Sequence, residues 1–147
     1  MKEISIINRK ARFEYHVLEV YKAGIVLTGT EIKSLRLGNA NISEAFCLFV
    51  DGELFIRNMF ISEFKNGTYN NHVPIRDRKL LLTKKELKKL ESAASDRGHT
   101  IIPLKVYSSE TGYAKIEIAL ATGKKTYDKR EDIKQREVER QIKRIMG

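Results

Sequence analysis

The chain has 147 residues, 41% of them hydrophobic and 32% charged, and carries a formal net charge of +9. This length suits one domain plus at most a tail. No apolar run approaches the roughly 18 residues of a membrane-spanning helix, and the first residues lack the apolar core of a signal peptide. The single cysteine, Cys47, excludes an intramolecular disulfide and fits a reducing compartment. We therefore expect a cytoplasmic protein, and the positive charge favours a polyanionic partner.

The first third of the chain predicts a basic arm, a long strand and a short helix. Residues 1–12 form the arm, and residues 13–29 form the strand, in which Phe13, Tyr15, Val17 and Tyr21 should share one face. Within it, Gly24 should mark a bend or a bulge. Thr28 and Glu31 then have the spacing of a capping box, so a helix should follow and stop at Gly38.

The middle of the chain contains the clearest hairpin. Asp51 and Gly52 separate two β-rich runs within residues 42–61, and Asp-Gly is a strong hairpin signal. Residues 62–79 contain few core-forming side chains and should form a loop that ends in basic residues. Residues 79–82 should then form a short strand or lead into a helix.

The last part of the body predicts one helix and two strands. Thr83 and Glu86 form a second capping box, so a helix with exposed lysines should run to about Gly98. Residues 100–107 should be a strand in which Pro103 marks an edge or a bulge, and residues 113–121 should be the returning strand. The pattern predicts a mainly β fold, an oligonucleotide-binding-like closed antiparallel barrel of about six strands with two or three short helices.

Residues 123–147 differ from this body, which we assign to residues 1–122. They contain nine Lys or Arg and five Asp or Glu residues, so they contribute +4 to the net charge (9 − 5). Their helical apolar stripe of Val138, Ile142, Ile145 and Met146 is narrow. Isolated helices of this length are marginal in water. We expect a basic tail that is disordered when free and helical when a partner supplies the missing surface.

The residue pattern offers little for catalysis or metal binding. The three histidines and Cys47 are far apart in sequence and lack metal-ligand spacing. Cys47 lies in an apolar strand, where burial should raise the pKa of its thiol and make it a poor nucleophile. We therefore expect no metal, no cofactor and no catalytic residue.

RNA binding is the better interpretation. Basic residues gather in the arm, in the first helix, in residues 76–79 and in the tail. Lys and Arg neutralise phosphates, and Asn71 and His72, which precede the third cluster, are residue types that reach sugars and unstacked bases. An RNA-processing enzyme and a generic ribosome-associated RNA-binding protein remain alternatives.

Five ordered strings resemble one family. They are NRKARFEY (8–15), GTEIKSLRLGNANI (29–42), NHVPIRDRKLLL (71–82), GHTIIPL (98–104) and GKKTYDKREDIKQRE (123–137). Together they resemble small protein B (SmpB), the tmRNA-binding or SsrA-binding family of bacteria, nearly from end to end. FISEF (60–64) departs from the more usual family string, so the loop that follows it is expected to sit differently.

The resemblance implies a function without catalysis. Members bind the tRNA-like domain of tmRNA and accompany it to ribosomes stalled on mRNA that lacks a stop codon. The tail then senses the empty mRNA channel and decoding site, so that the nascent chain is tagged and the ribosome rescued. The implied partners are tmRNA, the small ribosomal subunit and, through alanyl-tmRNA, elongation factor Tu. The implied state is a monomer with no membrane association.

The resemblance also assigns site residues. In the body, Glu31 is expected to organise basic neighbours rather than bind phosphate, and with Asn71 and His72 from the reasoning above the RNA-binding set is Asn8, Arg9, Lys10, Glu31, Lys33, Arg36, Asn71, His72, Arg76, Arg78, Lys79 and Leu81. In the tail, Tyr127 takes the place of a ring that can stack on a decoding-site base. The ribosome-sensing set is Lys124, Lys125, Tyr127, Asp128, Lys129, Arg130, Lys134, Arg136, Arg144, Ile145 and Met146.

Overall fold

The computed structural model describes residues 3–65 and 71–123. The strands are β1 (Ser5–Ile7), β2 (Tyr15–Ile25), β3 (Ala40–Asn41), β4 (Phe46–Val50), β5 (Glu53–Arg57), β6 (Phe60–Ile61), β7 (Arg78–Leu81), β8 (His99–Ser108) and β9 (Ala114–Gly123). The helices are α1 (Ala11–Glu14), α2 (Gly29–Arg36) and α3 (Lys84–Ala94). The predicted tail from Lys124 onward lies outside the described residues.

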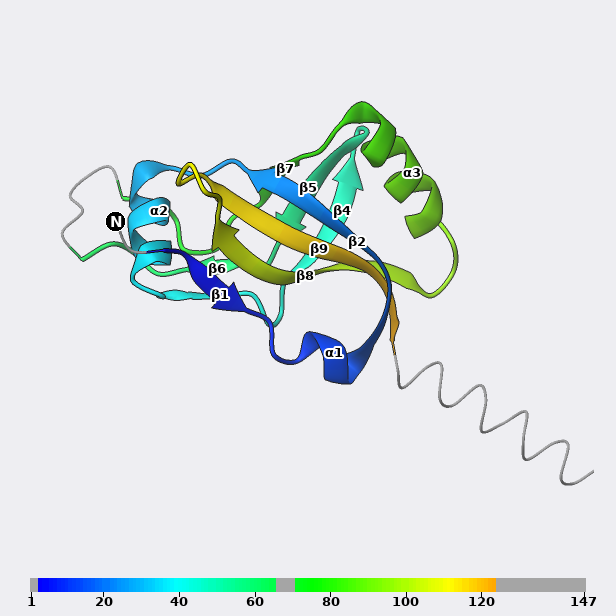
Figure 1. The fold of residues 1–147 in the computed structure, drawn as a ribbon, viewed down its shortest axis with the longest axis horizontal. Helices are drawn as coiled ribbons and strands as arrows, with labels where there is room; N and C mark the ends of the chain where they lie inside the picture. Colours follow the sequence, from blue (N-terminus) through cyan, green and yellow to red (C-terminus); the bar gives the residue numbers. More distant parts are fainter. Residues whose placement is uncertain (1–2, 66–70, 124–147) are drawn as a thin grey trace, which may run out of the picture.

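The larger sheet closes into a barrel. Its strand order is β1-β8-β4-β5-β7-β2-β9, and a further pairing of β8 with β9 completes the ring, with β1 added outside it (Figure 1). All pairings are antiparallel. The predicted mainly β barrel is therefore confirmed. Closure leaves few exposed strand edges.

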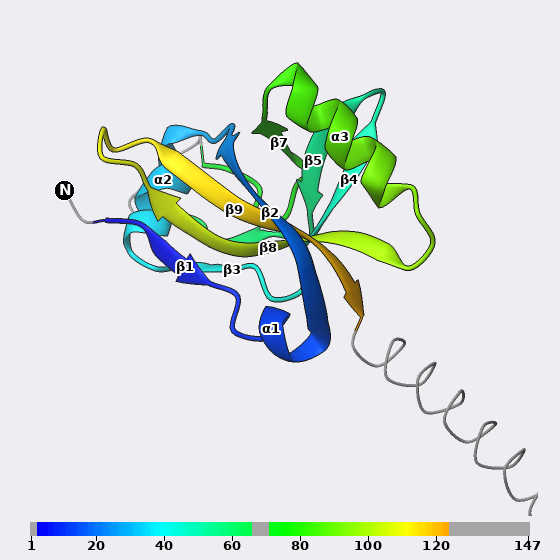
Figure 2. The same ribbon diagram turned by 45° about the vertical axis from the view of Figure 1, so that its right-hand side comes forward.

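The barrel interior follows the predicted alternation of β9. Ile116, Ile118 and Leu120 point into the main core. Leu35 of α2 and Leu90 of α3 are fully buried in the same core, and the two helices lie at opposite ends of the barrel (Figures 1 and 2). Each helix thus closes one end of the barrel with an apolar side chain.

The local signals for turns and helix starts are confirmed. Thr28 with Glu31 and Thr83 with Glu86 both form complete capping boxes at the starts of α2 and α3. Asp51 (φ 52°) and Gly52 (φ 80°) join β4 to β5. Positive φ at both positions is what a type I′ hairpin turn requires, and Asp-Gly tolerates it. The register of β8 against β9 shifts between Pro103 and Lys105, as the expected bulge requires.

The prediction of a strand over residues 13–29 is wrong at its beginning. Residues 11–14 form α1, and Phe13 is 82% exposed instead of facing the core. The bulge of β2 lies between Val17 and Glu19 and not at Gly24. A one-residue slip reverses the side-chain faces. Tyr15 and Val17 therefore pack in a second cluster outside the barrel, while Tyr21 enters the main core.

Within the part of the chain that the structure describes, no helix has the length and apolarity needed to cross a membrane.

Candidate nucleic-acid interface

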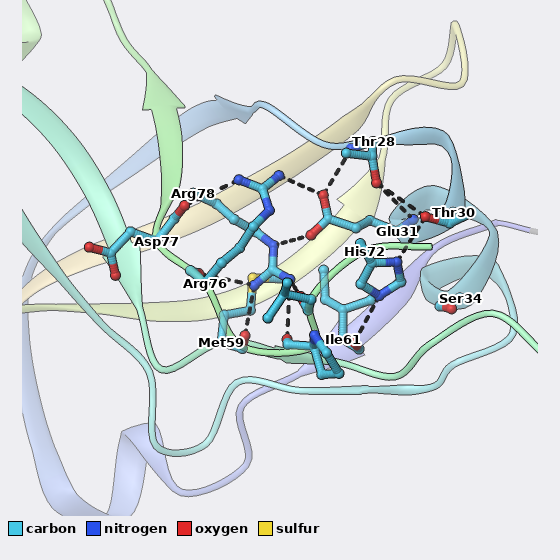
Figure 3. Close-up of polar contacts among 12 residues, drawn as sticks. Thr28, Thr30, Glu31, Ser34, Met59, Ile61, His72, Arg76, Asp77 and Arg78 are labelled. Atoms are coloured by element: carbon cyan, nitrogen blue, oxygen red, sulfur yellow. Dashed lines mark hydrogen bonds and ion pairs between the residues drawn. The ribbon is translucent and has the colours of Figure 1, made fainter. Parts of the chain in front are cut away.

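Glu31 is the centre of a buried polar network between α2, β6 and β7 (Figure 3). Its side chain has no exposed surface. Its Oε1 accepts from the backbone N–H of Thr28 at 2.9 Å and from Nη2 of Arg76 at 2.7 Å, and its Oε2 accepts from Nε of Arg78. One carboxylate therefore caps α2 and binds two arginines that lie far along the chain.

Arg78 extends this network to the backbone. Its guanidinium is fully buried. Nη1 donates to the carbonyl oxygens of Met59 (2.7 Å) and Arg76 (3.3 Å), and Nη2 donates to those of Pro74 (3.2 Å) and Val73 (3.5 Å). Five fixed donors in one plane make arginine suited to such a role. Arg78 thus holds the segment before β7 against the turn between β5 and β6.

The charges in this network favour its ionised form. Burial alone would raise the pKa of Glu31, but hydrogen bonds from Arg76, the Thr28 N–H and Arg78 together hold that pKa below its usual range. Burial lowers the pKa of Arg78, and the ion pair with Glu31 opposes that shift. A guanidinium remains charged in proteins, so the pair is ionic. Removing one partner would leave an uncompensated buried charge.

His72 belongs to the same interior. It is 7% exposed. Its Nε2 lies 2.9 Å from the carbonyl oxygen of Ile61, and its Nδ1 lies 2.9 Å from the hydroxyl of Thr30. Because a carbonyl oxygen can only accept, Nε2 donates there, and the Thr30 hydroxyl can donate to Nδ1. The ring therefore ties α2 to β6.

Asn71 binds the backbone of Phe64. Its Nδ2 donates to the carbonyl oxygen of Phe64 at 2.8 Å, and its Oδ1 accepts from the Phe64 N–H at 3.2 Å. The ring of Phe64 lies 5.4 Å from Nζ of Lys33, on the exposed side of α2. This cation–π contact holds an exposed lysine beside Phe64.

The N-terminal arm lies along β8. Asn8 is buried, its N–H donates to the carbonyl oxygen of Leu104 at 2.8 Å, and its Nδ2 donates to that of Pro103 at 2.9 Å. Arg9 and Lys10, which follow it, are exposed. Asn8 therefore fixes the arm so that its basic neighbours face outward.

Two more residues of the predicted RNA-binding set, Lys79 and Leu81, lie on β7. Lys79 is 40% exposed and its Nζ lies 3.1 Å from Oε1 of Glu53, in a solvent-exposed ion pair. Leu81 is 52% exposed. It pairs with Gly24 of β2, and a Cβ on that glycine would lie 3.4 Å from the Leu81 Cβ. Such exposure of a strand leucine is compatible with contact to a partner.

The predicted body residues therefore fall into two groups. Asn8, His72 and Arg78 are buried and bonded inside the protein, and their contact with RNA stays a prediction. Glu31 binds two basic neighbours, Arg76 and Arg78, and its part in RNA binding stays a prediction. Accessible side chains remain on Arg9, Lys10, Lys33, Arg36, Asn71, Arg76, Lys79 and Leu81. The predicted tail residues lie outside the described part of the chain.

Other side chains outside the predicted set also form contacts or line a cavity. Arg12, Lys105 and Glu117 line a shallow cavity of about 240 Å³ together with Arg9. Thr30 supports His72. Arg57 and Asp77 form an exposed two-point ion pair, with Nε to Oδ1 at 3.1 Å and Nη2 to Oδ2 at 2.9 Å. These pairings join distant strands, so sequence spacing carries no signal for them.

The described residues suggest no separate chemical centre. Among residues 3–65 and 71–123, no group of three or more His, Cys, Asp or Glu side chains is placed to hold a metal ion. Cys47 is buried, and that burial raises the pKa of its thiol.

Known proteins are similar to this chain over nearly its whole length. The family model described as SmpB protein matches residues 5–147. A relative from Cytophaga hutchinsonii, named SsrA-binding protein, is 57% identical over 145 residues, covering 99% of this chain and 95% of the relative. A relative of the same name from Thermosipho melanesiensis is 49% identical over 144 residues, covering 98% of each.

The fold is similar to that of a solved structure described as "tmRNA-SmpB: a journey to the center of the bacterial ribosome". The TM-score is 0.70 at 48% sequence identity, covering 82% of this chain and 84% of that chain. Sequence, fold and family model thus agree. The chain belongs to the SmpB protein family.

Proposed function

We propose that this chain is an RNA-binding adaptor of trans-translation. It binds the tRNA-like domain of tmRNA and delivers it to ribosomes stalled on mRNA that lacks a stop codon. The observation that carries the proposal is the family match over residues 5–147, together with relatives named SsrA-binding protein that align over nearly their entire length.

The body provides the RNA-binding surface. Arg9, Lys10, Lys33 and Lys79 present exposed cations, which can neutralise phosphates. The Glu31 network holds α2 and the segment before β7 in fixed positions. A rigid body of this kind can read the shape of a folded RNA, which is how structured RNA is recognised.

The tail from Lys124 supplies the ribosome-sensing function in this proposal. Its sequence supports it, because basic residues alternate with a narrow apolar stripe and the string DKR matches the family motif. Asp128, Lys129 and Arg130 would act in tagging, and Tyr127 would stack on a decoding-site base. The distal set of Arg144, Ile145 and Met146 would order only when bound.

The remaining parts of the proposal concern location, oligomeric state, catalysis and partners. The chain acts as a cytoplasmic monomer, catalyses no reaction itself, and meets elongation factor Tu through alanyl-tmRNA. Support for these parts comes from the family match.

A reconstituted tagging reaction tests the function. Ribosomes translating an mRNA without a stop codon would receive alanyl-tmRNA, elongation factor Tu and this chain. We expect tagged nascent chains only when the protein is present. Equal tagging without it, or none with it although tmRNA is bound, would contradict the proposal.

A further inference from the structure

A polar cavity of about 370 Å³ lies between the end of α2 and the loop that joins β8 to β9. It is lined by Arg36 of α2, by Glu3 before β1 and by residues 108–112 of the loop. Figures 1 and 2 both place this loop beside α2. The volume lies within the roughly 300–1,000 Å³ of small-ligand sites, so the cavity can hold one small polar group.

Tyr113 presents an aromatic ring beside this cavity. It is 72% exposed. The N–H of Ser109, a lining residue, donates to the Tyr113 carbonyl oxygen at 2.8 Å, and the Tyr113 N–H donates to the Ser109 Oγ at 3.1 Å. The next pair along the hairpin is Ser108 with Ala114, and Ala114 packs against the main core. Because side chains alternate along a strand, Tyr113 lies on the outer face.

Arg36 supplies an unpaired cation on the opposite wall. It is the last residue of α2, whose position is fixed by the capping box of Thr28 with Glu31 and by the buried Leu35. Within residues 3–65 and 71–123, its guanidinium forms no ion pair or hydrogen bond. RNA-binding proteins use exposed rings for unstacked bases and cations for the adjoining phosphates. Tyr113 and Arg36 offer this combination on two ordered elements.

Two carboxylates decide which part of a nucleotide fits the cavity. Glu3 and Glu110 also line it, and both are exposed. They outnumber the single cation, so the cavity does not suit a run of backbone phosphates. A carboxylate instead accepts hydrogen bonds from the exocyclic amino groups of adenine, cytosine or guanine, a group that uracil lacks. The lining therefore fits one phosphate and the amino-bearing edge of one base.

We propose that this cavity, with Tyr113 at its edge, binds one unstacked nucleotide of tmRNA whose base carries an exocyclic amino group. The ring of Tyr113 stacks on the base, Arg36 binds the phosphate, and the carboxylate of Glu110 accepts from the amino group. The inference rests on the proposed function, because it takes tmRNA as the ligand. It adds Tyr113 and Glu110 to the RNA-binding residues, and it gives the body a contact that depends on base identity.

Photo-crosslinking tests whether a nucleotide occupies the site. Tyr113 is replaced by p-benzoylphenylalanine in the full chain, which keeps an aromatic ring there, and the variant is mixed with tmRNA and irradiated. We expect one main crosslink, mapped by reverse transcription to an unpaired A, C or G. Crosslinks spread over paired nucleotides, a main crosslink to a uridine, or no crosslink would overturn the proposal. Val50, 43% exposed on the β4–β5 hairpin, carries the probe in the control, and an equal yield there would also overturn it.

Substitutions of Tyr113 measure the stacking. Tyr113→Ala should weaken tmRNA binding about tenfold, because one base loses the ring on which it stacks. Tyr113→Phe keeps the ring, and its affinity should stay within about twofold of wild type. Equal affinities of wild type and Tyr113→Ala would overturn the proposal. Because the replaced ring is exposed, both variants should keep the thermal unfolding midpoint of wild type.

The sign of the effect at Glu110 tests the contact to the base. Removing a carboxylate close to RNA ordinarily strengthens binding, because its repulsion of the phosphates is lost. In the proposed site, Glu110→Gln loses a charged acceptor, and tmRNA affinity should fall about threefold. Glu91→Gln changes an exposed carboxylate of α3 and is the matched control, which should not weaken binding. An unchanged or higher affinity of Glu110→Gln would overturn the proposal.

Failure of the cavity proposal and failure of the proposed function give different results. If the wild-type chain binds tmRNA and the variants Tyr113→Ala and Glu110→Gln bind it equally well, the cavity proposal is overturned and the proposed function stands. If the wild-type chain itself does not bind tmRNA, the proposed function is overturned, and the cavity proposal falls with it.

Discussion

Arg78 and Glu31, 47 residues apart in sequence, form an ion pair in which neither side chain has exposed surface. The carboxylate also caps α2, and the guanidinium also binds the carbonyl oxygens of Met59 and Pro74. The pair therefore joins a helix start, a strand turn and the entry to β7. Both residues belong to the predicted RNA-binding set, and in the structure they are bonded to each other and to the backbone.

Breaking this pair should destabilise the protein strongly. Arg78→Ala and Glu31→Ala are each expected to lower the free energy of unfolding by about 3–5 kcal/mol, because each leaves a buried charge without a partner. The double variant Glu31→Leu with Arg78→Met should lose less than the two alanine variants together. Urea unfolding followed by circular dichroism measures all four proteins.

The exposed pair Arg57–Asp77 provides the control. Both side chains are more than 40% exposed, so Asp77→Ala should change the free energy of unfolding little. A loss in Asp77→Ala as large as that in Arg78→Ala would show that burial is not what makes the Glu31 pair important.

Stability should depend on the ionisation of Glu31. Its pKa lies below the ordinary value of 4.5 in the folded state. The ionised form therefore stabilises the fold fully above that ordinary value, and the stabilisation is lost as the pH falls through the folded-state pKa. In the wild type, the free energy of unfolding should fall with a slope approaching about 1.4 kcal/mol per pH unit from this group. Glu31→Gln should lack this part of the slope, and identical profiles from pH 7 to about pH 3 would refute the assignment.

Local patterns predicted the parts of the fold that depend on neighbours in sequence. The capping boxes at Thr28 and Thr83 and the Asp51-Gly52 turn each need only a few adjacent residues. The beginning of β2 could not be predicted in this way. Alternation placed Phe13 on a strand, but the backbone turns through α1, which buries Ala11 against the outer cluster. That outcome depends on packing between distant strands.

RNA affinity should respond to the accessible cations. Lys79→Ala should weaken tmRNA binding and lower the slope of log affinity against log salt by roughly 0.7–0.9, the value expected for one lost phosphate contact. Its free energy of unfolding should stay near that of wild type, because the ion pair with Glu53 is exposed. Lys88 of α3 is also exposed, lies outside the predicted set, and serves as the matched control. Equal changes in slope for Lys79→Ala and Lys88→Ala would indicate a general charge effect.

The tail should matter for tagging and not for tmRNA affinity. A chain that ends at Gly123 is expected to bind tmRNA nearly as tightly as the full chain and to give no tagging of nascent peptides on non-stop ribosomes. Tagging by this shortened chain would refute the sensing role.

Within the tail, Tyr127→Ala should reduce tagging more than Tyr127→Phe does, because base stacking uses the ring face and contributes about 1–3 kcal/mol. The rate of tag addition in single-turnover reactions compares the two. Equal losses would assign the effect to the hydroxyl group.

The candidate site was predictable only in part. The sequence indicated which segments carry basic residues, and Arg9, Lys10 and Lys79 lie accessible as expected. It gave no indication that His72 would be enclosed by Thr30 and Ile61, 42 and 11 residues away. The sequence alone does not distinguish a histidine or arginine that contacts RNA from one that bonds to neighbouring residues of the protein. Only the folded contacts separate the two roles.

The central claim is that this chain selects tmRNA through a body held by the Glu31 network. The most direct measurement is to crosslink RNA to the full chain in bacterial cells, purify the protein and sequence the bound RNA. The variant Arg78→Ala, whose Glu31 network is broken, is treated in parallel. The account predicts one dominant structured RNA, tmRNA, with crosslinks in its tRNA-like domain, and a marked loss of that signal in Arg78→Ala. A broad distribution of messenger fragments with the wild-type chain would contradict it.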